Sequence, residues 1–138
     1  MLGTTKVRGF ASDSSDVMPS AVLSVLDQIR NHPTKASTSY YVKYFERYFE
    51  GMLASLKEIR RVCAADSPGL FVVQDSFYKD IHIDLQQLLV EIAESCGWAA
   101  DSRHDFPVPR TLAASNPRSR KYRTNHKATE SVIQLRAA

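Results

Sequence analysis

The stretch LFVVQDSFYKD, Leu70–Asp80, decides how this sequence is expected to fold. It begins with a short apolar run that follows the turn residues DSPG, and it ends abruptly in hydrogen-bonding side chains. Such a run is typical of a strand buried on both faces, as in parallel sheets. Ligands of open α/β sheets collect beyond the carboxyl ends of the strands. The side chains at this end, which are the candidate pocket residues, are Gln74, Asp75, Ser76 and Tyr78.

The same cluster also fits a purely structural role. In a pocket, Asp75 can accept a proton or orient an amine, Gln74 can pair with a base edge, and Tyr78 can stack on a ring. In the structural alternative, Asp75 and Ser76 accept hydrogen bonds from backbone N–H groups where the next helix begins. The local sequence on its own favours the structural role.

Three helices are predicted around this strand, over residues 19–31, 37–64 and 85–96. The first must end before His32, because that residue precedes a proline and proline disfavours helix there. The third has Asp84 and Gln87 as a capping box and Gly97 as its C-terminal stop. A helix that follows a strand in this way is typical of a doubly wound α/β unit.

The long helix carries a continuous apolar stripe at helical spacing. Its members are Val42, Phe45, Phe49, Met52, Leu53, Leu56, Ile59 and Cys63. Beside the stripe lie Tyr41, Tyr44 and Tyr48, which can stack on bases but are more often the shoulder of a core, the interpretation that we favour. A coiled coil also fits the spacing, although the flanking positions lack regular paired charges.

Two further strands are predicted, over Trp98–Phe106 and Glu130–Arg136. The inward-facing residues of the last strand are expected to be Val132, Ile133 and Leu135. Residues 1–18 are rich in Gly, Ser, Thr and Asp without apolar periodicity, and are expected to form a loop or a loose end.

The positive charge of the chain is concentrated between these two strands. The net charge is +3, but residues 103–127 contain seven bases and one acid, so this segment carries about +6 and the remainder about −3. A basic patch on a mildly acidic body suggests a polyanionic partner such as nucleic acid. A solvated basic loop explains the charge equally well. Loops of this length inside compact domains are usually functional or disordered.

Other kinds of site are not indicated. The four histidines show no metal-ligand spacing relative to one another or to the two cysteines. No serine lies in a nucleophile elbow, and the five glycines form no phosphate-binding loop. Cys63 and Cys96 are expected to be reduced thiols in the core. Without a run of roughly 20 apolar residues or a signal peptide, a cytoplasmic location is expected.

Four segments, taken in order, resemble the C-terminal half of a family of S-adenosylmethionine-dependent, site-specific DNA amino-methyltransferases of the Rossmann-like class. The segments are YYVKYFERYFEGMLASLKEIRRV, GLFVVQDSFYKDIHIDL, DFPVPRTLAASNPRSRKYR and ATESVIQLR. The resemblance covers nearly the whole chain, including the loop around LGTTKVRG, and assigns residues 19–138 to the C-terminal part of one α/β domain. It implies that Leu70–Gln74 is the fifth strand of a seven-stranded sheet, Trp98–Phe106 the sixth, and Glu130–Arg136 the seventh. The seventh strand would lie antiparallel between the other two.

The resemblance also implies roles for single residues. The wall of the target-base pocket would be formed by Gln74, Asp75, Ser76 and Tyr78, beside a flipped adenine or cytosine whose amine is methylated. The contacts to DNA phosphates would come from Arg118, Arg120, Lys121 and Arg123, with Arg110 and Asn116 as weaker candidates.

Two motifs of that family are missing from this sequence. One is the Gly-containing turn that binds the cofactor, and the other is a catalytic loop ending in Pro-Pro-Tyr, since none of the six prolines adjoins another. We therefore expect no catalytic residue in this chain, and neither S-adenosylmethionine binding nor methyl transfer by the chain alone. A fifth strand without its neighbour would leave an apolar edge that can pair with a complementing N-terminal half or a second copy.

Two alternative functions remain open. The first is a non-enzymatic module that binds nucleic acid through residues 103–127, with an affinity that falls as salt rises. The second is an interaction or scaffold protein that uses the tyrosine-lined helix, and it predicts a stable oligomer without affinity for DNA.

Overall fold

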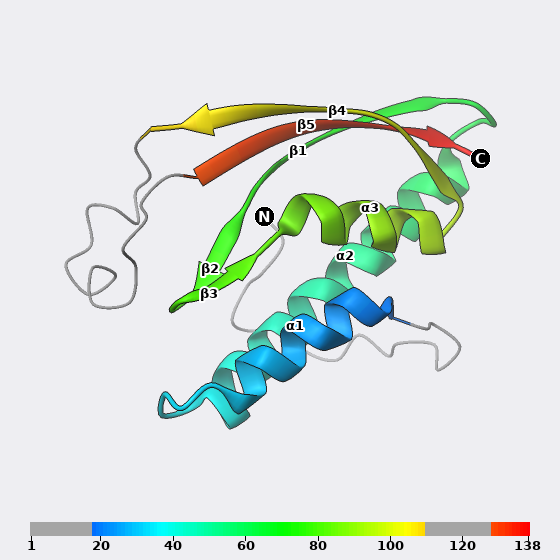
Figure 1. Ribbon diagram of the computed structural model, residues 1–138. Helices are drawn as coiled ribbons and strands as arrows, with labels where there is room; N and C mark the ends of the chain where they lie inside the picture. Colours follow the sequence, from blue (N-terminus) through cyan, green and yellow to red (C-terminus); the bar gives the residue numbers. More distant parts are fainter. Residues whose placement is uncertain (1–17, 110–127) are drawn as a thin grey trace.

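The computed structural model describes residues 18–109 and 128–138, in which the first helices are followed by three strands, a further helix and two more strands (Figure 1). The helical elements are α1 (Ser20–Asn31), the π-helical turn η1 (Ser37–Tyr41), α2 (Val42–Val62) and α3 (Leu85–Ser95). The strands are β1 (Pro68–Gln74), β2 (Ser76–Tyr78), β3 (Ile81–Ile83), β4 (Trp98–Val108) and β5 (Ala128–Ala137). The fold is therefore mixed α/β, and all three predicted helices and all three predicted strands are present.

The main sheet has the strand order β1-β5-β4. The strand β5 pairs antiparallel with β1 on one side and with β4 on the other, so β1 and β4 run in the same direction. The prediction that the last strand lies antiparallel between the other two is confirmed. Among the described residues every strand pair is antiparallel, so the structure shows mixed α/β architecture without the parallel pairs of a doubly wound sheet.

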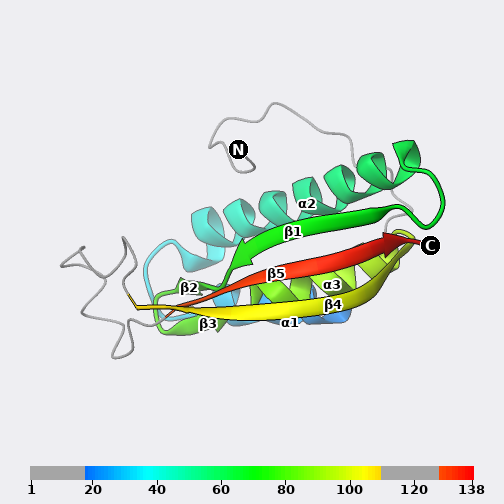
Figure 2. The ribbon, with the colours of Figure 1, turned by 90° about the horizontal axis from the view of Figure 1, so that it is seen from above.

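All the helices lie on one face of this sheet (Figures 1 and 2). Along β1, Phe71 and Val73 pack against the core beneath the sheet, whereas Leu70 and Val72 are 69% and 63% exposed on the opposite face. The prediction that this strand is buried on both faces is wrong, because no helix of the described residues covers the second face. An unbroken apolar run cannot by itself reveal which of its two faces is open.

The alternation of β5 corrects a second prediction. The residues buried on its helix-covered side are Ser131, Ile133, Leu135 and Ala137. Val132 was expected to face inward with Ile133, but it pairs with Val72 on the open face and is only partly buried. Adjacent residues of a strand point to opposite faces, so Val132 and Ile133 cannot both be core residues.

The core lies between the sheet and the helices. Its largest fully buried apolar side chains are Phe49, Ile29, Ile83, Ile92 and Ile133. The predicted stripe of the long helix is buried at Val42, Phe49, Met52, Leu53 and Leu56. Ile59 was expected in the same stripe but is 42% exposed.

The helix boundaries follow the predicted signals with two changes. Asp84 caps α3 as expected, since its Oδ1 accepts a hydrogen bond from the backbone N–H of Gln87 at 3.0 Å. The side chain of Gln87 donates to Glu91 instead of completing a capping box. Gly97 ends the helix with a φ of 89°, a value that favours glycine. The turn η1, which opens the long helix in a π conformation, was not predicted.

A small hairpin, β2–β3, was also missed by the sequence analysis. It occupies the residues that were expected to lead directly into the third helix, and its two-residue turn is Lys79-Asp80. Lys79 adopts a left-handed conformation there, with a φ of 58°. Cys63 and Cys96 do not form a disulfide, which agrees with the prediction of two reduced cysteines, and both are partly buried against the core.

Candidate functional site

Asp75 joins the main sheet to the hairpin at the end of β1. Its backbone N–H donates to the carbonyl oxygen of Thr129 at 3.0 Å, and its Oδ1 accepts a hydrogen bond from the backbone N–H of Thr129 at 3.0 Å. The carboxylate is only 10% exposed. Asp75 therefore fixes the start of β5 against the end of β1.

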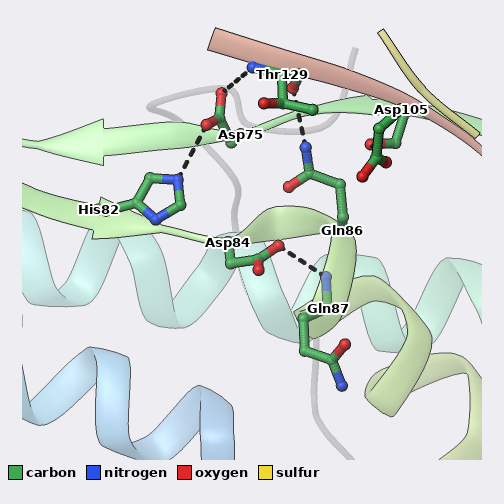
Figure 3. A network of polar contacts seen from close by, with 8 residues as sticks. Asp75, His82, Asp84, Gln86, Gln87, Asp105 and Thr129 are labelled. Carbon is green, nitrogen blue, oxygen red and sulfur yellow. Dashed lines mark hydrogen bonds and ion pairs between the residues drawn. The ribbon is translucent and has the colours of Figure 1, made fainter. Parts of the chain in front are cut away.

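The second carboxylate oxygen of Asp75 holds the imidazole of His82 (Figure 3). The His82 Nε2 lies 2.9 Å from Oδ2, and the ring packs against Phe77 across the hairpin with the two centroids 4.8 Å apart. Half of the His82 side chain is exposed. Both oxygens of Asp75 are therefore engaged, one in the sheet and one in orienting an imidazole at the surface.

Gln86 completes the network from the first turn of α3. It is buried to 1% exposure, and its Nε2 donates to the same Thr129 carbonyl at 2.9 Å (Figure 3). A buried amide of this kind needs a partner, because leaving it unsatisfied costs about 1–3 kcal/mol. The first residues of β5 are thus held from β1 by Asp75 and from α3 by Gln86.

Asp105 lies on β4 opposite Ser131 of β5. The Ser131 hydroxyl donates to its Oδ1 at 2.5 Å, and Arg103 Nε donates to the same oxygen at 2.6 Å. The hydrogen bond from Arg103, and after it that from Ser131, lowers the pKa of Asp105 below the ordinary value of an aspartate. Asp105 is therefore an anion that ties β4 to β5 at the end of the sheet where Asp75 lies.

The structure separates the four predicted pocket residues into two groups. Gln74, Asp75 and Ser76 follow one another at the carboxyl end of β1, with Gln74 opposite Glu130 of β5. Tyr78, predicted as a wall residue of the same pocket that could stack on a ring, is 5% exposed in the core, and its hydroxyl lies 2.7 Å from the Oγ of Ser37. Its hydroxyl and ring are occupied in packing, so in this chain Tyr78 supports the cluster rather than lining a pocket.

The structural alternative for the cluster is partly correct. Asp75 does accept a hydrogen bond from a backbone N–H group, as expected, but from Thr129 on a distant strand rather than from the next helix. Thr129, Gln86 and His82 were not predicted as members of this network. No local signal marks Thr129 or Gln86, since their partners lie 54 and 43 residues away along the chain.

A second histidine links the hairpin to the helices. His32 Nε2 lies 2.7 Å from the carboxylate of Asp80 in the hairpin turn, and its ring packs edge-on against Tyr78. The hydrogen bond from His32 lowers the pKa of Asp80. The hairpin is therefore fastened at both ends, to the sheet by Asp75 and to the loop before α2 by His32.

The predicted DNA contacts, Arg110, Asn116, Arg118, Arg120, Lys121 and Arg123, lie outside the described residues, as do residues 1–17. The first residues of the basic segment 103–127 belong to β4, which ends at Val108. β5 begins at Ala128, and these two residues are paired. Because Gln74 and Phe106 both lie opposite Glu130, the segment emerges at the end of the sheet that carries Gln74 and Asp75 (Figure 1).

Within residues 18–109 and 128–138, no three His, Cys, Asp or Glu side chains are placed so that they could hold a metal ion. None of the described helices is long and apolar enough to span a membrane. Comparison of the chain with protein-family models, with curated proteins and with solved structures found no match.

Proposed function

We propose that this chain is the substrate-side portion of an S-adenosylmethionine-dependent DNA amino-methyltransferase, and that it is inactive alone. One observation carries the proposal: β5 lies antiparallel between β1 and β4, in the order that the sequence resemblance implies for the fifth, seventh and sixth strands. The helix before β1 and the helix between β1 and β4 lie on the same face of this sheet (Figure 1).

The position of the basic segment supports the same proposal. The described residues that flank it, Val108 and Ala128, are paired two positions from the Glu130 that lies opposite Gln74, so the segment begins and ends near the cluster after β1. In this proposal Gln74, Asp75 and Ser76 form one wall of the pocket for a flipped adenine or cytosine. Asp75 keeps that wall rigid through its hydrogen bonds to Thr129 and His82.

The described glycines do not fit a cofactor site. Gly51 lies inside α2, Gly97 ends α3, and Gly69 lies in β1, where a Cβ would meet the rings of Phe71 and Trp98. None of them forms a turn after a strand that a nucleotide could approach closely. The proposal therefore assigns S-adenosylmethionine binding and the Pro-Pro-Tyr loop to residues outside this sequence, and derives no catalytic step from this chain.

A nucleic-acid-binding module without an enzymatic partner is the second candidate, and the position of the basic segment supports it equally. Both candidates predict that the chain alone binds duplex DNA through phosphate contacts. Replacing Arg118, Arg120 and Arg123 with Ala should weaken binding and reduce the slope of log affinity against log salt by about 3, since each phosphate contact contributes roughly 0.9.

The matched control replaces three bases on the exposed face of α2, Lys43, Arg47 and Arg61, and removes the same charge. Fluorescence anisotropy of a labelled duplex over a series of salt concentrations measures the slope of log affinity against log salt for each triple variant. Equal losses of affinity in the two triple variants would mean that net charge alone drives binding. An absence of salt-sensitive binding by the unaltered chain would count against both candidates.

A further inference from the structure

A row of exposed side chains at the start of α2 combines aromatic rings with positive charges. Its members, which we call the aromatic–basic stripe, are Tyr40 of η1 and Lys43, Tyr44 and Arg47 of α2. They stand at positions i, i+3, i+4 and i+7, which lie on one face of a helix. All four are exposed, Tyr40 to 57% and Tyr44 to 37%. The buried residues of the helix lie on its opposite face, and they are Val42, Phe49, Met52, Leu53 and Leu56.

The structure divides the row of tyrosines that was expected beside the core. Tyr41 and Tyr48 pack against the core, as the favoured interpretation predicts, whereas Tyr44 is exposed. Tyr40, which lies outside that row, is the most exposed aromatic side chain of the described residues. The rings of Tyr40 and Tyr44 each meet one neighbouring ring at nearly a right angle, with centroids 5.2 Å from Tyr41 and 5.6 Å from Phe45. A perpendicular contact covers at most one face of a ring, so each keeps a face on which a planar group can stack.

The turn that carries Tyr40 is held in an uncommon conformation. Ala36 precedes it with a φ of 70°, a left-handed value that is rare for alanine. The Ala36 carbonyl accepts hydrogen bonds from the N–H groups of both Tyr40 and Tyr41, at 3.0 and 3.1 Å. Ser37 is fully buried, and its Oγ lies 2.7 Å from the hydroxyl of Tyr78 in the hairpin. Such π-helical turns are rare and are frequent at functional sites, and this one fixes Tyr40 at the surface.

The two bases of the stripe are not neutralised by neighbouring acids. Among the described residues, no acidic side chain pairs with Lys43 or Arg47. The nearest acids of the helix lie to one side of the stripe, on the side that faces α1, since Glu46 bonds to Arg30 of α1 at 3.2 Å. Glu50 follows one turn later on that same side. The positive charges of Lys43 and Arg47 are therefore available to a partner.

A third positive charge lies beside η1. The Nζ of Lys79, in the hairpin turn, lies 6.0 Å from the centroid of the Tyr41 ring, a distance typical of cation–π contacts. The chain outside residues 103–127 carries a net charge of about −3. Bases gathered around exposed tyrosines are therefore not a general property of this surface.

Interleaved rings and positive charges match the chemistry of an unpaired nucleic-acid strand. Every base has a flat face that stacks on an aromatic ring, and the phosphates between bases pair with lysine and arginine. A duplex keeps its base faces stacked inside and offers only phosphates and base edges, which would leave the rings without a role. An acidic peptide would likewise pair with the charges and leave the rings unused.

We infer that the aromatic–basic stripe binds a single strand of nucleic acid. Bases of the strand stack on Tyr40 and Tyr44, and its phosphates pair with Lys43 and Arg47. This site is separate from the proposed pocket after β1 and from the basic segment, and the inference does not rest on the proposed function.

The first test uses a fluorescein-labelled oligothymidylate of about ten nucleotides, which is within the usual site size of single-strand-binding surfaces. Anisotropy should show saturable binding to the full chain. Replacing Tyr40 and Tyr44 together with Ala should weaken binding at least about tenfold, because two stacking platforms are lost. Replacing both with Phe keeps the rings and should change the affinity by less than about threefold.

Three further probes test the chemistry without altering the chain. An abasic oligonucleotide of the same length keeps the phosphates and loses the bases, and should bind at least about tenfold more weakly. An oligouridylate should bind within about threefold of the oligothymidylate, because only bases and phosphates are assigned to the stripe. An oligoglutamate of equal charge should bind as weakly as the abasic probe.

The charges are tested by one substitution and its matched control. Arg47→Gln should reduce the slope of log affinity against log salt for the oligothymidylate by about 0.7, the contribution of one phosphate contact on a single strand. Arg61→Gln removes the same charge from the same helix, about 21 Å further along its axis, and should leave the slope nearly unchanged.

Two comparisons separate the stripe from the basic segment. The Tyr40→Ala, Tyr44→Ala chain should keep its affinity for duplex DNA within about twofold, because a duplex presents no unpaired base. The same two substitutions should weaken oligothymidylate binding by the same factor in a chain with Ala in place of Arg118, Arg120 and Arg123.

The inference would be overturned by an absence of oligothymidylate binding, by equal binding of the abasic probe, or by an oligoglutamate that binds as tightly. Equal losses with Phe and with Ala would overturn the stacking, and loss of the tyrosine effect without the three arginines would place the strand on the basic segment instead. Tyrosine-dependent single-strand binding by a chain that fails to bind duplex DNA would remove the proposed function and leave the stripe standing. Salt-sensitive duplex binding without oligothymidylate binding would do the reverse.

Discussion

At the scale of single residues, the cluster after β1 shows what a sequence can and cannot specify. The polar run at Gln74 and Asp75 correctly marks the place where the strand ends, since hydrogen-bonding side chains commonly follow buried strands. Its partners, Thr129 and Gln86, belong to elements far along the chain, and only the folded structure brings them together. The residue types were predictable, and their roles depended on tertiary contacts.

Tyr78 provides a direct test of the burial assigned to this cluster. Tyr78→Phe keeps the ring but leaves the fully buried Ser37 hydroxyl without its partner, which should lower the free energy of unfolding by about 1–2 kcal/mol. Tyr44→Phe removes the same atom from an exposed tyrosine and should change it by less than about 0.5 kcal/mol. Urea unfolding curves of the two variants measure the difference, and equal values would contradict the assigned burial.

At the scale of elements, the local signals were sufficient for the helices and strands that carry periodic apolar patterns. The first predicted helix ended where proline required, and the third was capped by Asp84. The hairpin β2–β3 was missed because each strand has only three residues, too few for a periodic pattern, and because its turn contains lysine where glycine or asparagine is usual. The open face of β1 was missed because burial depends on what covers a strand.

Two glycines in neighbouring elements should respond to alanine with opposite signs. Gly51→Ala should stabilise the isolated chain by about 0.5–1 kcal/mol, because the site is helical and has open space for a methyl group. Gly69→Ala should destabilise it, because the new Cβ would lie 2.9 Å from the ring of Phe71 and 3.1 Å from that of Trp98. Denaturant unfolding checks both signs, and a loss of stability in Gly51→Ala would mean that the space beside α2 is filled.

At the scale of the whole molecule, the fold is asymmetric in two ways. Helices cover one face of the sheet and leave Leu70, Val72 and Phe106 exposed on the other. The edge strand β4 carries charged residues and a bulge, whereas the edge strand β1 has no charged residue. One open face is common in antiparallel sheets, and both strand pairs of this sheet are antiparallel. Mixed α/β architecture and strand order were predictable from the resemblance and the apolar pattern.

Our proposal at this scale is that the chain supplies the DNA side of an enzyme whose cofactor side lies outside this sequence. The most direct measurement is the transfer of a labelled methyl group from S-adenosylmethionine to duplex DNA. It would be made with this chain, with a polypeptide carrying the cofactor turn and the Pro-Pro-Tyr loop, and with the two together. The proposal predicts transfer only in the mixture. Methyl transfer or S-adenosylmethionine binding by this chain alone, or an inactive mixture of two folded and associated chains, would contradict it.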